Sequence, residues 1–83
     1  MQKEMQKVML EPKEKLSNGA EVISFTQFND EEGVVLCHWN RVTPYVVWRT
    51  YRPYESLEWV TESGDYCRTI TGAVQAYNRR GGK

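Results

Sequence analysis

Short runs of β-branched and aromatic residues, separated by polar segments, recur along this chain and predict a series of short strands. Each run places β-branched or aromatic residues two positions apart, which is typical of a half-buried strand. The runs span residues 20–28, 34–41, 45–52, 57–61 and 66–68, and the polar residues 62–65 predict a turn between the last two. Short connections between consecutive strands favour an antiparallel meander.

From residue 70 the apolar period changes to that of a helix. Ile70, Ala73, Val74 and Tyr77 are spaced three and four apart, so they form one stripe that we expect to be buried against the sheet. Either Thr69 or Thr71 can cap the helix start, and the glycines at 81 and 82 end it.

These elements predict an α+β fold: an antiparallel sheet of four or five strands with one C-terminal helix packed on one face. The opposite face is then expected to stay open. We expect one domain over residues 17–80 and a flexible tail over 81–83. Residues 1–16 are expected to form a partly ordered segment, either a short helical turn or a frayed tail. The turn at 17–19 allows residues 13–16 to pair as a hairpin arm.

The chain has 83 residues and no net charge, but the charge is unevenly distributed. Residues 1–36 carry four lysines against seven acidic residues, whereas residues 37–83 carry all six arginines. The apolar run at residues 8–10 is too short for a signal-peptide core or a membrane span, so we expect a cytoplasmic protein with reduced cysteines.

The strand at 45–52 carries large side chains on both of its faces, and so small a domain is expected to leave one of them exposed. Trp48 and Trp59 are expected in the core. Trp, Tyr and Arg dominate protein–protein contacts, and a neutral chain suits a protein partner, or a second copy, better than nucleic acid. Nucleic-acid binding by an arginine and aromatic sheet face is the alternative. The candidate partner-binding residues are Trp39, Arg41, Tyr45, Arg49, Tyr51, Arg52 and Tyr54.

The acidic loop Asp30, Glu31 and Glu32 has two interpretations. It can be a solvated turn, or it can imitate phosphates and occupy a basic groove on a partner.

Catalytic and metal-binding patterns are weak in this sequence. Cys37 and His38 are adjacent, so on a strand they point to opposite faces, whereas a pairing of Cys67 with His38 stays open. A disulfide between Cys37 and Cys67 is possible in principle. The sequence has neither a Cys-x-x-Cys pair nor a glycine-rich phosphate loop. We therefore expect no enzyme activity, no metal and no cofactor.

Three segments carry a resemblance to known proteins: residues 33–36, the run Thr43-Pro44-Tyr45-Val46-Val47-Trp48-Arg49, and residues 73–80. Together they resemble small uncharacterised proteins encoded by bacterial phages and plasmids, which have a similar aromatic strand and end in a short amphipathic helix. The resemblance implies a mobile-element accessory protein. The most specific hypothesis that it implies is an inhibitor of a host nucleic-acid-processing complex.

Overall fold

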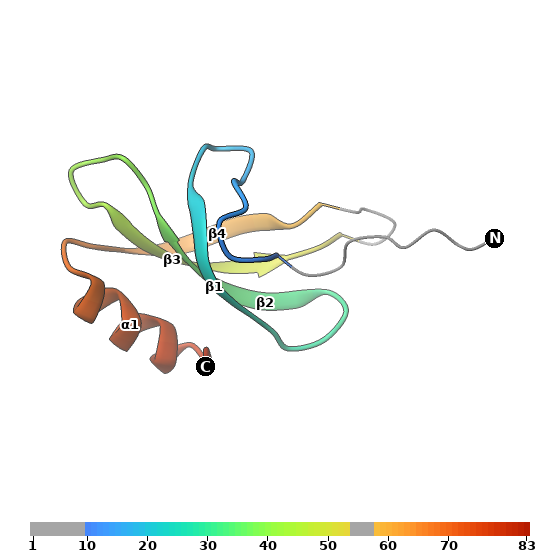
Figure 1. The fold of residues 1–83 in the computed structure, drawn as a ribbon. Coiled ribbons are helices and arrows are strands. Elements are labelled where there is room, and N and C mark those ends of the chain that lie inside the picture. The colour runs from blue at the N-terminus through green and yellow to red at the C-terminus, as the bar shows by residue number, and fades with distance from the viewer. Residues whose placement is uncertain (1–9, 54–57) are drawn as a thin grey trace.

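The computed structural model describes residues 10–53 and 58–83, and within them the chain forms one sheet and one helix (Figure 1). The strands lie in chain order across the sheet, and every neighbouring pair is antiparallel. The predicted α+β class is confirmed, with four strands. The elements are β1 (Glu21–Gln27), β2 (Glu32–His38), β3 (Tyr45–Tyr51), β4 (Val60–Cys67) and α1 (Ile70–Arg79).

The two central strands form the core because both of their faces are covered. On one face Val34, Leu36 and Val47 pack against α1. On the other face Val35 and Trp48 pack against the segment that precedes β1. Branched and aromatic side chains suit this double-sided burial, and they account for the nearly continuous apolar runs of β2 and β3.

The second face of the sheet is not open, contrary to our expectation. Leu10, Leu16 and Ala20 lie against it, and residues 10–20 lie on the opposite side of the sheet from α1 (Figure 1). The expected hairpin arm holds this segment in place: Lys13 N donates to the Val22 carbonyl oxygen at 2.8 Å, and Gly19 turns the chain with φ 91°. Residues 1–9 lie outside the described residues.

The predicted turn at residues 62–65 is wrong, because these residues lie inside β4. Arg49 pairs with Glu62 and Val47 with Asp65, so two β4 residues face the single residue Trp48. This is a β-bulge, with φ 55° at Ser63. A Cβ atom at Gly64 would lie 2.8 Å from Trp48 Nε1, so glycine makes room for the indole.

Helix α1 begins at the Thr69 cap, whose hydroxyl accepts a hydrogen bond from Gly72 N at 3.0 Å. The predicted burial of Ile70 and Val74 is wrong, since these side chains are 41% and 40% exposed. The buried stripe is Ala73, Ala76 and Tyr77. Small alanines let the helix approach the sheet closely, and the hydroxyl of Tyr77 fixes its rotation through hydrogen bonds to two β1 hydroxyls, those of Ser24 at 3.1 Å and Thr26 at 2.7 Å.

The segment that follows the helix lies against the sheet. Gly82 N donates to the Tyr77 carbonyl oxygen at 2.9 Å, and Lys83 N donates to Thr26 Oγ1 at 3.0 Å. Residues 81–83, predicted as a tail, therefore contact both α1 and β1.

Candidate functional site

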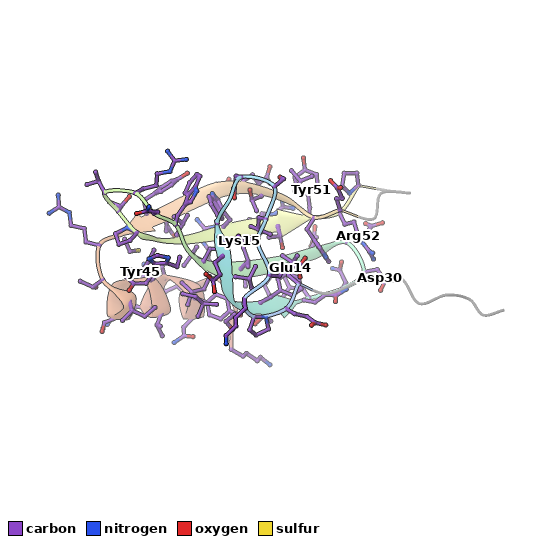
Figure 2. All side chains as sticks on the ribbon, turned by 45° about the horizontal axis from the view of Figure 1, so that its top comes forward. Glu14, Lys15, Asp30, Tyr45, Tyr51 and Arg52 are labelled. Atoms are coloured by element: carbon purple, nitrogen blue, oxygen red, sulfur yellow. The ribbon has the colours of Figure 1, made fainter. Side chains whose placement is uncertain are left out.

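The predicted contact residues fall into two groups at opposite ends of the sheet. Figure 2 shows Tyr51 and Arg52 beside Asp30 at one end and Tyr45 at the other. We call the first the hairpin end, because it holds the β1–β2 turn, the last residues of β3 and the first of β4. The other is the loop end, with the β2–β3 loop and the start of α1. Tyr54 lies outside the described residues.

At the loop end, Trp39 and Arg41 pack onto their own chain. The guanidinium carbon of Arg41 lies 4.5 Å from the centre of the Trp39 ring, and that ring meets Trp48 edge-on at 5.0 Å. Trp39 Nε1 also donates to the Asn18 carbonyl oxygen at 3.2 Å. Tyr45 is half-buried, with its ring 5.5 Å from that of His38. These residues join the β2–β3 loop to the turn before β1. Contacts within the fold therefore explain why aromatic and arginine side chains lie here.

At the hairpin end, Arg49 is the centre of a charge network on the helix-bearing face. Its Nη1 is paired with the Glu62 carboxylate, and its Nη2 lies 3.3 Å from Glu32 Oε2. Its guanidinium carbon also lies 5.6 Å from the centre of the Tyr51 ring. β2, β3 and β4 each contribute to this network, because the register sets Arg49 between the two glutamates. The arginine therefore has three partners within its own chain although it is exposed.

Arg52 fastens the acidic loop to the end of β3. Its Nη2 and Nε both donate to the Asp30 carbonyl oxygen, at 2.8 and 3.2 Å, and its backbone N donates to the Glu31 carbonyl oxygen at 2.8 Å. The guanidinium carbon lies 5.3 Å from the centre of the Trp59 ring. The loop is therefore held through its backbone.

The surface at the hairpin end is hollowed on both sides of Arg49 and Glu32. The larger hollow, of about 420 Å³, is lined by Glu31, Glu32, Arg49, Tyr51, Arg52, Pro53 and Glu62. The smaller, of about 240 Å³, is lined by Phe28, Glu32, Gly33, Val34, Arg49 and Arg80. Because the two hollows share Glu32 and Arg49, we treat them as one surface and call it the Arg49 groove.

Six lining residues of this groove were not predicted as site residues from the sequence: Phe28, Gly33, Val34, Pro53, Glu62 and Arg80. Phe28 lies just before the acidic loop in the sequence, which was a usable signal, and it is 48% exposed in the structure. Glu62 was assigned to a turn. Arg80 lies at the end of α1, where its Nε donates to Asp65 Oδ2 at 2.9 Å.

The strand register separates the reactive residues of the described part of the chain. Register pairs His38 with Tyr45 and Tyr45 with Cys67, so β3 lies between the backbones of His38 and Cys67, which are two strand spacings apart, about 9–10 Å. Cys37 points to the other face, where burial raises the pKa of its thiol to about 12. Both cysteines are free thiols, so the possible disulfide is not formed. Within residues 10–53 and 58–83, no three His, Cys, Asp or Glu side chains gather as metal ligands would.

Comparison of the chain with protein-family models, with curated proteins and with solved structures found no match. In the part of the chain that the structure describes, no helix has the length and apolar character needed to span a membrane.

Proposed function

We propose that this chain is a non-catalytic protein-binding module that contacts its partner through the Arg49 groove. The observation that carries the proposal is that α1 covers only part of its face of the sheet. The uncovered end presents Arg49 and Tyr51 beside two hollows, together with the half-exposed ring of Phe28. Arginine and aromatic side chains around a concave surface are typical of the residues that dominate protein–protein contacts.

The groove is also preorganised for binding. Glu32, Glu62 and the Tyr51 ring hold the Arg49 guanidinium, and the backbone of the acidic loop holds Arg52. A side chain that is already fixed loses little conformational entropy when a partner binds, and this increases the affinity available from a small surface.

Nucleic-acid binding has less support. Arg41, Arg49 and Arg52 each lie over an aromatic ring of their own chain. Arg49 is in addition neutralised by two carboxylates, so phosphates would compete with existing partners. Single-strand binding needs free ring faces and a positive surface, and the rings at the hairpin end lie among acidic residues.

Pairing of two copies edge to edge also has less support. The outer strands β1 and β4 each carry a register shift, between Val22 and Ser24 and opposite Trp48. Bulges bend an edge strand and interrupt the regular hydrogen-bonding row that a second strand would need. A separate protein is therefore the partner we propose, and the resemblance to phage and plasmid proteins favours a host nucleic-acid-processing complex.

Site-specific photo-crosslinking tests the proposal. p-Benzoylphenylalanine replaces Tyr51 in one variant and Val42 in a control, since Val42 is 87% exposed in the β2–β3 loop. Each variant is irradiated inside the cells that naturally make the protein. We expect one crosslinked protein from position 51 and none from position 42. Crosslinks from position 42 alone, crosslinks to nucleic acid, or no crosslink from position 51 would refute the proposal.

A further inference from the structure

The two hollows of the Arg49 groove differ in chemistry. The smaller has apolar walls from Phe28 and Val34 and lies where α1 ends. The larger is bordered by three carboxylates, those of Glu31, Glu32 and Glu62. A partner segment that fills both therefore needs one apolar side chain and one that suits carboxylates.

The spacing of the hollows follows from the register. Only the smaller hollow is lined by Val34, which pairs with Arg49, and only the larger is lined by Tyr51, which pairs with Glu32. These pairs are two residues apart along the strands, or about 6.6–6.8 Å. Side chains on one side of an extended peptide repeat over the same distance. An extended segment can thus place residues i and i+2 in the two hollows.

The net charge around the groove determines whether the partner residue in the larger hollow is a cation or an anion. Arg80 and Asp65 neutralise each other. Among the described residues at this end, four carboxylates then remain against the guanidiniums of Arg49 and Arg52, and Lys83, which is bonded to Thr26, adds one positive charge. The carboxylates are those of Asp30, Glu31, Glu32 and Glu62. The described part of the hairpin end is therefore acidic, although the whole chain is neutral.

We infer that the Arg49 groove binds an extended segment of the partner protein in which an apolar residue and a Lys or Arg stand two positions apart. The apolar side chain occupies the hollow at Phe28 and Val34, and the cation lies on the Glu31 side of the larger hollow, because Glu32 and Glu62 are already paired with Arg49. This inference rests on the proposed function, and it adds the chemistry of the bound segment.

Selection from a random library of displayed dodecapeptides, with the full chain as bait, tests the inference. We expect enrichment of peptides with an aliphatic or aromatic residue two positions from Lys or Arg. Their binding should weaken as NaCl is raised, because the carboxylates on the rim are exposed. Enrichment of acidic peptides, or no enriched peptide, would overturn the inference.

Matched variants locate the binding of the enriched peptides. Asp30→Asn with Glu31→Gln removes two rim charges and leaves the backbone bonds to Arg52 in place, so we expect affinity about threefold to tenfold lower. Glu11→Gln with Glu21→Gln removes the same charge outside the groove and should leave affinity within about twofold.

Phe28→Ala removes one wall of the apolar hollow and should abolish the preference for the apolar residue without affecting the fold, because Phe28 is exposed at a turn. Equal binding to wild type, the rim double variant and Phe28→Ala would overturn the inference. The outcome for the proposed function is separate: a partner crosslinked at position 51 through an acidic segment refutes only the inferred chemistry.

Discussion

Replacement of Arg49 by Met tests whether the charge network holds in solution. Methionine keeps most of the aliphatic stem that packs on the sheet and removes the guanidinium. Three contacts disappear together: the pair with Glu32, the pair with Glu62 and the contact over the Tyr51 ring. The two glutamates then face each other across β3 with no cation between them.

The structure sets the size of the effect. The side chains of Arg49, Glu32 and Glu62 are 44%, 49% and 42% exposed, so each ion pair is screened by water and contributes about 0.2–1 kcal/mol. An exposed contact between a cation and a ring adds about 0.5–1 kcal/mol. We therefore expect Arg49→Met to lower the free energy of unfolding by about 1–2 kcal/mol, which is about 1 M in the urea midpoint for a chain of this size.

A double-mutant cycle with Glu32→Gln gives the sharper result. In the wild type, Glu32→Gln removes an ion pair and should destabilise the fold. In the Arg49→Met background it relieves repulsion from Glu62 and should stabilise the fold, so its effect changes sign. Urea unfolding followed by tryptophan fluorescence measures all four proteins, with 1 M NaCl as a control that should shrink the coupling. If Glu32→Gln has the same effect in both backgrounds, to within about 0.3–0.5 kcal/mol, the network does not exist in solution.

Three further predictions test the fold. Because burial raises the pKa of Cys37 from 9.0 to about 12, the folded chain keeps its thiol proton longer than the unfolded chain. The free energy of unfolding should fall by about 1.4 kcal/mol per pH unit as pH rises from 9 towards 12, and Cys37→Ala should remove this pH dependence from urea-unfolding measurements. At neutral pH a disulfide reagent should modify only the half-buried Cys67. Thr69→Ala deletes the helix cap and should cost about 1 kcal/mol in thermal unfolding, while the exposed Thr71→Ala stays within about 0.5 kcal/mol. Tyr77→Phe removes a hydrogen-bond partner from two β1 hydroxyls and should cost about 1–2 kcal/mol in urea unfolding.

Local sequence was sufficient for the elements that depend on local physics. The apolar runs of β2 and β3, the Thr69 cap and the glycines after α1 each involve residues a few positions apart, and all are found in the structure. The turn predicted at 62–65 failed because polar residues with a glycine fit a bulge as well as a turn. What decides between them is the Trp48 indole opposite Gly64, a contact that only the strand register creates.

The residue types of the candidate site could be predicted from the sequence. Which of these residues lie together at one end of the sheet could not. Arg49, Tyr51, Arg52 and the acidic loop were all singled out, but the sequence gives no reason to place them together and Trp39 at the other end. Arg52 meets Asp30 from 22 positions away, and Arg49 meets Glu32 from 17. These meetings depend on the meander order and on the length of each hairpin. The covered second face was missed for the same reason, since residues 10–16 have too few apolar positions to indicate that they pack on the sheet.

The groove exists because the helix is shorter than the strands beneath it. The ten residues of α1 span about 15 Å, and the seven of β3 span about 23 Å. Since α1 starts near Cys67 at the loop end, about 8 Å of the face is left at the other end, which is the length of two strand residues and holds Tyr51 and the larger hollow. The helix stops where Gly81 adopts φ 95°, a conformation that suits glycine and ends the helical path. Arg80 and Arg49 line the same hollow, so the helix ends beside the groove. A chain of 83 residues needs both faces of its sheet for a core, and the end of one face is the part of the described sheet that α1 leaves uncovered.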